Sequence, residues 1–427
     1  MAVTGIVLFV LLLLAVPIGI ALSLAAAATV AADPLLNSEA IFRSFFNFIG
    51  RYSLMAIPLF IFAGFLMERT GLVSQLFRFA DALVGWLPGG FGVATVVACV
   101  LFGAISGSSV AMAAAMSVIA IPEMTKRGYP PWLAAGLVAT AGGIAIMIPP
   151  SILLLLYGIV TETSVVRLFF AGVIPGLLLA LGNILTVMGI AIYLKLPRGR
   201  FDVKRLWPET RGALPALGMP VVILGGLYGG LFTPTEAAAA ACGYALLYGL
   251  IRKRGEFVKQ ILPVAAKSLN LTAVILFLVG SVGVFQFVAA NLYWPQKITE
   301  AVVSLGLSPL GFIFAFMGIL LILGMLVDGV AMVLLTVPVV FPIAMALNID
   351  PIHLGILIAL NAETGVVTPP IGLNIFTVSG TSKIPIQSVL KGTIPFFLGD
   401  ITVLVLVIFF PELATWLPNL LVTDVFK

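Results

Sequence analysis

Long, uninterrupted apolar segments are the feature that most constrains how this chain can fold. Hydrophobic residues make up 61% of its 427 positions and charged residues only 9%. An ordinary soluble domain carries about 25% charged residues, so the bilayer must be the solvent for most of this chain. The sequence therefore predicts an all-α polytopic membrane protein. Its apolar segments run over 4–32, 53–67, 89–122, 132–160, 169–194, 213–231, 235–251, 269–293, 308–347, 352–381 and 393–420.

Composition also excludes several classes of function. So few charges exclude a disordered chain, a coiled coil and a nucleic-acid-binding protein. The only histidine is His353, and Cys99 and Cys242 both lie in apolar segments, so we expect neither a disulfide framework nor a zinc site. Ser106, Ser108 and Ser109 are the candidate nucleophiles, but no obvious base accompanies them, and we expect no enzymatic activity. The apolar stretch from Val3 to Ala32 has no basic residues before it and is too long for the apolar part of a signal peptide. We therefore interpret it as a retained membrane span.

Basic residues gather in two connecting segments. The segment 195–211 contains six Lys and Arg residues, and the segment 252–267 contains five. By the positive-inside rule we expect both to be cytoplasmic loops. The two apolar segments between them return the chain to the same side, so the two predictions agree.

The chain contains an internal repeat. A shift of 220 residues lays 101–176 over 321–396 without a gap. Five prolines coincide under this shift, where random placement predicts on the order of one or fewer. The pairs include Pro122 with Pro342, and Pro149-Pro150 with Pro369-Pro370. Chance similarity between apolar segments does not account for this agreement.

Charge indicates that the two copies have opposite orientations. The loop 123–130 carries two basic residues, whereas its partner 343–350 carries none. The segment 382–391 carries two lysines, whereas its partner 162–171 has one arginine near a glutamate. The charge bias changes sides between the copies, which is typical of the inverted-topology repeats of secondary transporters. We therefore expect 123–130 to be cytoplasmic and 343–350 to be periplasmic.

Each copy is interrupted twice by glycine or proline, at 103–109 and 142–151 in the first and at 324–330 and 361–372 in the second. Backbone carbonyls freed by proline must face protein, water or an ion, because lipid cannot satisfy them. Together with serine and threonine hydroxyls they suit Na⁺, and the half-helix N-termini suit a carboxylate. Plain close packing and simple kinks are the alternatives, but recurrence at matched positions argues against both.

Two acidic residues lie at the interruptions of the second copy, Asp328 and Glu363. Acids inside a membrane are costly and usually functional, although a hydrogen-bonded structural acid is the alternative. Glu236 is interpreted differently. The sequence Thr233-Pro-Thr-Glu236 predicts a capping box at the start of a helix, with no ligand.

These motifs resemble those of the large membrane subunit of tripartite ATP-independent periplasmic (TRAP) transporters. They span nearly the whole chain in order, and the length fits the large subunit alone. The motifs that carry the resemblance are Pro58–Gly64, Phe102–Ser109, Ile148–Ser151 with Tyr157-Gly158, Leu168–Gly176, Phe232–Ala237, Asp350–His353 and Thr368–Gly372.

The resemblance implies an elevator-type transporter of the ion-transporter superfamily, in which a mobile domain carries two re-entrant hairpins and two broken helices past a scaffold. It implies coupling to Na⁺, no other cofactor, and an organic acid substrate delivered by a periplasmic binding protein. It also implies a small membrane subunit as partner and a place in the bacterial inner membrane. The expected division is a scaffold over 1–88, a first transport repeat over 89–176, connecting helices over 177–307, a second repeat over 308–396 and a C-terminal helix over 397–427.

The resemblance further implies two Na⁺ sites, each pairing one hairpin tip with the break of the same repeat. The expected Na⁺ ligands are Gly103, Ser106, Gly143, Ile146, Pro149, Gly324, Gly365 and Thr368. The expected substrate-binding residues are Ser108, Ser109, Pro150, Ser151, Asp328, Asn361 and Pro370. A channel and a proton-coupled organic-anion transporter remain as alternative functions.

Overall fold

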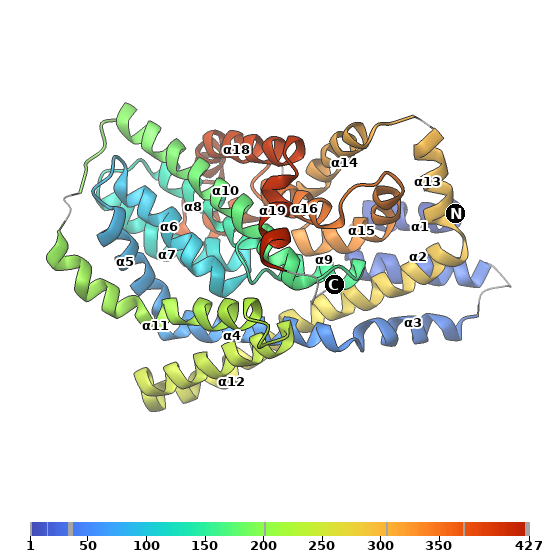
Figure 1. The fold of residues 1–427 in the computed structure, drawn as a ribbon, viewed down its shortest axis with the longest axis horizontal. Coiled ribbons are helices and arrows are strands. Elements are labelled where there is room, and N and C mark those ends of the chain that lie inside the picture. Colours follow the sequence, from blue (N-terminus) through green and yellow to red (C-terminus); the bar gives the residue numbers. More distant parts are fainter. Residues whose placement is uncertain are drawn as a thin grey trace.

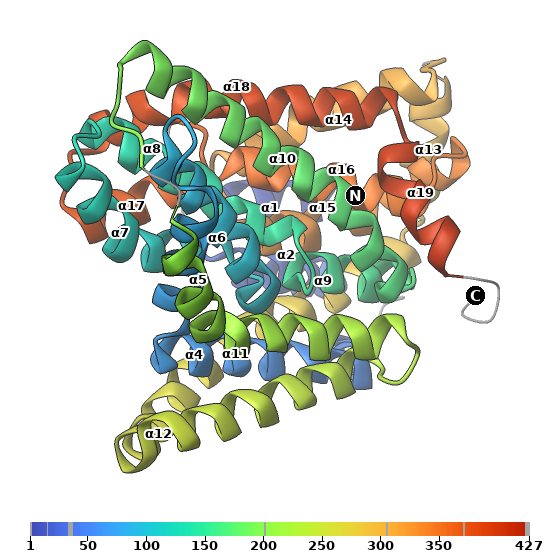
Figure 2. The ribbon, with the colours of Figure 1, turned by 60° about the vertical axis from the view of Figure 1, so that its left-hand side comes forward.

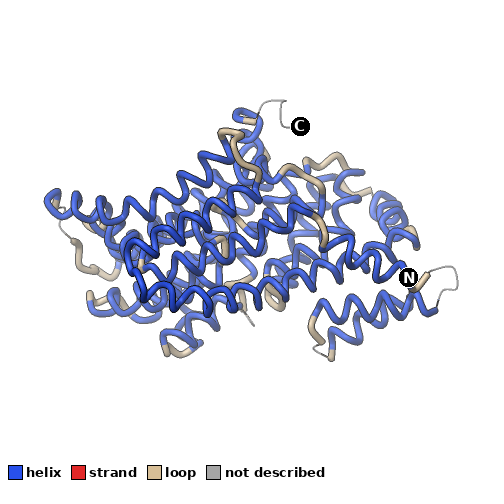
Figure 3. Tube along the Cα trace, turned by 90° about the horizontal axis from the view of Figure 1, so that it is seen from below, coloured by secondary structure: helices blue, strands red, loops and turns tan. Residues whose placement is uncertain are grey.

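The computed structural model describes residues 2–14, 16–32, 37–199, 202–304, 306–369 and 372–422. Within these ranges the regular structure is helical and contains no strand (Figures 1 and 3). The helices are α1 (Ala2–Leu13), α2 (Ile18–Ala32), α3 (Glu39–Ile49), η1 (Tyr52–Met55), α4 (Ala56–Thr70), α5 (Leu72–Val84), α6 (Gly90–Ser106), α7 (Ser109–Lys126), α8 (Pro131–Met147), α9 (Ile152–Thr161), α10 (Val165–Tyr193), α11 (Val203–Tyr228), α12 (Pro234–Asn291), α13 (Trp294–Ser304), α14 (Pro309–Gly324), α15 (Gly329–Ala346), α16 (Pro351–Gly365), α17 (Leu373–Ser382), α18 (Ile386–Phe409) and α19 (Glu412–Leu421).

The predicted repeat is confirmed by the helix boundaries. The shift of 220 residues carries α7 onto α15 at both ends, and carries α6, α8, α9 and α10 onto α14, α16, α17 and α18 within a few residues. In each copy two helices form a hairpin, and the next two are halves of a helix broken near a proline pair. The fold class is thus the predicted one: an all-α repeat protein with two hairpins and two broken helices.

The two copies interlock. The broken-helix half α8 packs on α18 of the second copy, and its counterpart α16 packs on α10 of the first. This reciprocal exchange is what a two-fold relation between copies produces. The tightest crossing joins Gly136 to Gly392, where a Cβ on either residue would collide with the other helix's backbone. Glycines at both positions therefore allow the copies to pack backbone to backbone.

Polar contacts hold connecting segments together at each of the two ends of the repeat core. At one end, Asp81 pairs with Arg127 at 3.3 Å and with Arg205 at 2.8 Å. This places the segments 123–130 and 195–211 together, consistent with one membrane face for both. At the opposite end of the broken helix, Tyr157 donates a hydrogen bond to the Pro351 carbonyl at 2.6 Å.

A second group of helices lies beside the repeats, with α2, α3, α4 and α11 packed on α12 (Figure 1; Figure 2 shows α4 and α11 next to α12). The predicted capping box starts α12, because Thr233 and Glu236 exchange hydrogen bonds between side chain and backbone. At 58 residues, α12 would be roughly 87 Å long if straight, far more than one span needs. It reverses at Arg254, whose φ is 46° and ψ −127°, and the ring of Phe257 folds back onto Gly249.

Two expectations about connections are wrong. The segment 252–267 is helical on both sides of Arg254 rather than a loop, because apolar residues between its basic ones keep the helical pattern. The apolar N-terminus is not one span but two helices, α1 and α2, that pack together and join Thr4 to Thr29 by a hydrogen bond. Helix α1 ends at Leu13, before Pro17, which has no backbone N–H to donate to a helical hydrogen bond.

Cys99 and Cys242 are both buried and free, as the sequence predicts. In the described part of the chain, seven helices are long and apolar enough to cross a membrane. Together with the shorter apolar helices, they identify the chain as a multi-pass membrane protein.

Candidate functional site

The first hairpin turns at Gly107, directly against the first helix break. Gly107 has a φ of +59°, in the left-handed region that favours glycine. A Cβ there would lie 2.6 Å from the carbonyl oxygen of Pro150. One turn earlier, Gly103 packs on α8, where a Cβ would lie 3.1 Å from the Ala145 Cα. The first tip and the first break are therefore in backbone contact.

At this junction a serine begins the second hairpin helix, α7, and another begins the second half of the broken helix, α9. Ser108 caps α7, accepting a hydrogen bond from the Ala111 N–H at 3.5 Å. Ser151 caps α9, accepting one from the Leu154 N–H at 3.3 Å. Each hydroxyl satisfies one backbone donor and leaves the others of the first turn without a helical partner. Both half-helix N-termini, with their positive dipole ends, thus belong to the region where the sequence predicts an anionic substrate.

The second hairpin also meets its break through glycine. A Cβ on Gly365 would lie 2.7 Å from the Gly324 Cα, so the backbones of α14 and α16 touch. The tip ends with Asp328, which caps α15 by accepting hydrogen bonds from the N–H groups of Val330 at 2.8 Å and Ala331 at 3.0 Å. Asp328 is exposed, so its carboxylate is hydrogen-bonded without being buried. The structure gives it a capping role.

Thr368 lies in the second break and is buried. Its hydroxyl donates to the Thr364 carbonyl at 2.6 Å, and its N–H donates to the Gly365 carbonyl at 3.0 Å. The hydroxyl oxygen keeps acceptor lone pairs that these bonds do not use. Pro370, predicted to bind substrate, lies outside the described residues.

Asn374 joins the two repeats at this site, and sequence reasoning missed it. Its side-chain amide donates to the Ser109 hydroxyl at 2.6 Å and to the Ala139 carbonyl at 3.0 Å. It is fully buried, and its own carbonyl oxygen has no partner among the described residues. The available signal was an asparagine in an apolar segment shortly after a proline pair, where the first repeat has Leu154.

The other predicted residues are not all near a tip. Ser106 ends α6 at the first tip, and Ile146 and Pro149 are buried around the first break. Gly143 lies one turn away and faces Glu363 of α16 instead, with which a Cβ would collide. Asn361 is buried on α16 and donates to the Met317 carbonyl at 2.8 Å, which fixes α16 against α14.

The first tip is packed against the second group of helices and leaves a cavity of about 20 Å³. Typical small-molecule sites are at least about 300 Å³, so this cavity is too small for an organic acid. Glu68 is the only acid among the described lining residues. No lysine or arginine is among the described lining residues, although the Nζ of Lys267 lies 4.1 Å from the ring centre of Phe65, which is one of them. The cavity is lined by Ile61, Gly64, Phe65, Glu68, Phe102, Ser106, Ser108, Ala111, Ile152 and Leu271.

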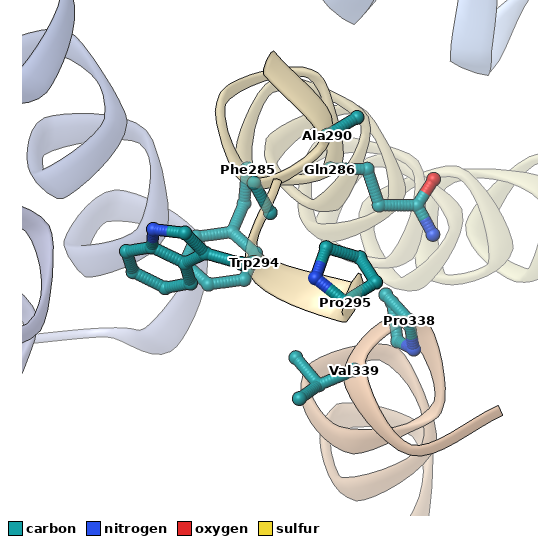
Figure 4. Close-up of a pocket in the computed structure, with 8 residues that line it drawn as sticks. Phe285, Gln286, Ala290, Trp294, Pro295, Pro338 and Val339 are labelled. Atoms are coloured by element: carbon teal, nitrogen blue, oxygen red, sulfur yellow. The ribbon is translucent and has the colours of Figure 1, made fainter. Parts of the chain in front are cut away.

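A larger cavity of about 210 Å³ lies between α12, α13 and α15 (Figure 4). Its walls include Phe285 and Trp294, whose rings pack edge to face, and Pro338 of α15. Pro338 is roughly 14 Å along α15 from its capped end, by the helical rise. No charged side chain is among the described lining residues, so this cavity is apolar and separate from the tips.

Comparison with known proteins identifies the family. The family model of the tripartite ATP-independent periplasmic transporter, DctM component, matches residues 6–413. The chain belongs to this family.

Relatives of known name agree over most of their length. The DctM-family chain is 37% identical over 433 residues to the C4-dicarboxylate TRAP transporter large permease protein of Vibrio cholerae, covering 96% of each. It is 36% identical over 392 residues to the ectoine/5-hydroxyectoine TRAP transporter large permease protein of Ruegeria pomeroyi, covering 90% of each. Relatives that are named for different substrates are thus similar to this chain over nearly its whole length.

A solved structure supports the architecture at lower identity. The Alcanivorax borkumensis YdaH transporter, whose crystal structure is described as having an unusual topology, aligns with a TM-score of 0.66. The alignment covers 94% of this DctM-family chain and 98% of that chain, at 12% sequence identity. At that identity the likeness concerns the fold alone.

Proposed function

We propose that this DctM-family permease imports organic acid anions in symport with Na⁺, taking its substrate from a periplasmic binding protein. The observation that carries the proposal is the meeting of each hairpin tip with the break of its own repeat. Gly107 lies against Pro150, and Gly324 lies against Gly365. These junctions gather half-helix ends of both polarities inside a membrane protein, where unpaired backbone groups need a ligand.

Na⁺ suits the carbonyl ends of these half-helices. The last carbonyls of α6, α8, α14 and α16 lack helical partners, and Ser106 and Thr368 add hydroxyl oxygens beside them. Oxygen ligands of this kind favour hard cations. The proposed ligands remain Gly103, Ser106, Ile146 and Pro149 at the first junction and Gly324, Gly365 and Thr368 at the second, with Gly143 retained from the resemblance although its own neighbour is Glu363.

An organic acid anion suits the positive, N-terminal ends of the helices at these junctions. The N-termini of α7, α9 and α15 present backbone N–H groups near the tips, and the described walls of the small cavity there carry no lysine or arginine. A carboxylate can be bound by helix N-termini alone. The dicarboxylate named for the V. cholerae relative supports this substrate class.

We further propose an elevator mechanism with a small membrane subunit as partner, in the bacterial inner membrane. The support is the arrangement of two helix groups: the interlocked repeats hold both junctions, while α2, α3, α4 and α11 pack around α12 beside them. A rigid repeat core could move past such a scaffold without losing its own contacts. One fused relative named as a DctMQ permease supports a second membrane component.

The test is uptake into proteoliposomes that contain the permease, its small subunit and the binding protein. The substrate is the compound that co-purifies with the binding protein. Uptake should rise sigmoidally with Na⁺ and should be negligible at low substrate without the binding protein. Unchanged uptake when K⁺ replaces Na⁺ would exclude Na⁺ coupling and favour protons. Flux that does not saturate would favour a channel.

A further inference from the structure

A group of buried polar side chains lies between the two repeats, on the far side of α16 from the second hairpin. Glu363 is two residues before Gly365, which turns its side chain roughly 200° around the helix from the contact with Gly324. It faces α8, where the residue is Gly143. Asp400 on α18 is close enough to interact electrostatically with Glu363. Asn183 on α10 donates a hydrogen bond to Asp400 at 3.3 Å.

These side chains hold oxygen atoms without hydrogen-bond partners. Among the described residues nothing donates to either carboxyl oxygen of Glu363, to Oδ2 of Asp400 or to Oδ1 of Asn183. Each of the three residues is at most 1% exposed. The amide nitrogen of Asn183 is used twice, since it also donates to the Leu179 carbonyl at 2.9 Å. Four oxygens from three helices are thus buried with acceptor capacity and no donor.

Such an arrangement is expensive unless something binds there. An isolated buried carboxylate costs several kcal/mol or more, and two beside each other cost more still. No described Lys, Arg or His makes an ion pair with either acid. The only other titratable group recorded as interacting with Glu363 is the Cys99 thiol of α6, which supplies no positive charge. The compensation comes either from protons on the carboxyl groups or from a bound cation, and only a cation uses all four free acceptor oxygens.

We propose that Glu363, Asp400 and Asn183 form a third Na⁺ site, inside the repeat core and separate from the two tip junctions. The inference rests on the proposed function for the identity of the ion. Three carboxylate oxygens and one amide oxygen are hard ligands that favour hard cations over soft ones. Because the oxygens come from α10, α16 and α18, the ion ties the first repeat to the second.

Gly143 belongs to the same site. Its missing side chain leaves the room that the Glu363 carboxyl occupies, and a Cβ would collide with both carboxyl oxygens. The same helix α8 packs on α18, the helix that carries Asp400. The missing Cβ of Gly143 therefore positions the carboxyl of Glu363.

The test is a count of bound Na⁺ on the purified permease with its small subunit, by equilibrium binding of ²²Na⁺. The double variant Glu363→Gln/Asp400→Asn keeps side-chain shape and removes both charges. We expect it to bind one Na⁺ fewer per chain than the wild type. Thr140→Val is the matched control, because Thr140 is also buried on α8 and its hydroxyl bonds only the Gly136 carbonyl of its own helix. An unchanged count in the double variant overturns the inference.

A second measurement does not depend on the variant folding. Cryo-EM maps of the wild-type complex in NaCl and in choline chloride should differ by density among the four oxygens, present only in NaCl. Two carboxyl groups in direct hydrogen-bond contact with no such density would mean a protonated pair and would overturn the inference. Failure of the proposed function is distinguishable, because a wild type without Na⁺ coupling would show no Na⁺-dependent uptake at all.

Discussion

The two hairpin tips have the same backbone plan and different chemistry. At the first tip a left-handed glycine, Gly107, turns the chain, and a serine begins the next helix. At the second tip an aspartate begins the next helix, and the closest contact is between Gly324 and Gly365. The position equivalent to Gly365 in the first repeat is Ala145, so only the second junction has glycine on both sides. The repeat places the two junctions at matched positions, and the side chains around them differ.

Asn374 makes the two junctions unequal in their polar contacts as well. It lies just after the second break, yet its amide bonds Ser109 of the first hairpin and a carbonyl of α8. Leu154, at the equivalent position of the first repeat, cannot return such a bond. The second repeat thus reaches into the first site by a polar contact, and the first repeat does not reciprocate there.

The largest difference between the tips is expected from glycine substitution at the close contacts. In Gly365→Ala the new Cβ would lie 2.7 Å from Gly324 Cα and 3.0 Å from its carbonyl carbon, and neither backbone can move freely. We expect loss of about 3 kcal/mol of stability and of measurable transport, as for severe overpacking. Gly103→Ala meets its nearest atom at 3.1 Å and should lose about 1 kcal/mol.

Thermal unfolding of both purified variants and uptake in proteoliposomes measure this difference. Equal losses of stability in Gly365→Ala and Gly103→Ala would mean that the two junctions are equally tight, and would contradict the proposed difference between the tips.

The turn of the first tip provides the next effect. Gly107→Ala places a Cβ at a φ of +59° and 2.6 Å from the Pro150 carbonyl oxygen. The left-handed conformation alone costs about 1–2 kcal/mol, and the contact adds to it. We expect stability to fall by roughly 2 kcal/mol and uptake to fall strongly, measured as above. Val327, the equivalent residue of the second tip, is half-buried, and Val327→Ala should have little effect on the turn.

Repeat position and break position could be predicted from the sequence because both depend on local chemistry. Pro149 and Pro150 are adjacent, so two successive backbone donors are missing and a break is favoured there, and their matched partners in the second repeat fixed the copy boundaries. The capping box at Thr233 was predictable for the same reason, since its four residues satisfy one another. Such features need no knowledge of neighbours far along the chain.

Long-range contacts could not be predicted in this way. The basic residues of 252–267 predict that the chain turns in this segment, but the local sequence does not predict that it stays helical on both sides of Arg254, where the ring of Phe257 packs on Gly249 after the turn. Gly143 was placed with the first tip, although its neighbour is Glu363, which is 220 residues away and comes from the other repeat. The roles of Asn374 and Asp400 likewise depend on which helices meet.

Thr368 tests whether the second junction uses side-chain oxygen. Thr368→Val keeps the shape and removes the hydroxyl, so the apparent Na⁺ affinity of uptake should fall by roughly tenfold, or about 1.4 kcal/mol. Expression and unfolding temperature should persist, because the lost bond to the Thr364 carbonyl is local. Thr233→Val is the control: it removes a cap outside the junctions and should change stability but not the Na⁺ curve. An unchanged Na⁺ curve in Thr368→Val would leave only backbone carbonyls as ligands at this junction.

The smallest effect separates the two caps. Ser108→Ala removes one long hydrogen bond of 3.5 Å, whereas Asp328→Ala removes two, at 2.8 and 3.0 Å. Cap removal costs about 1 kcal/mol, so the unfolding temperature should fall less for Ser108→Ala than for Asp328→Ala. Asp328→Asn keeps an oxygen acceptor for both N–H groups and removes the charge. If Asp328 is only a cap, the asparagine variant should transport like the wild type. If its negative charge assists the binding of Na⁺ beside the second tip, uptake should need more Na⁺ while stability stays near that of the wild type, and the second tip would then differ from the first in electrostatics as well as in packing.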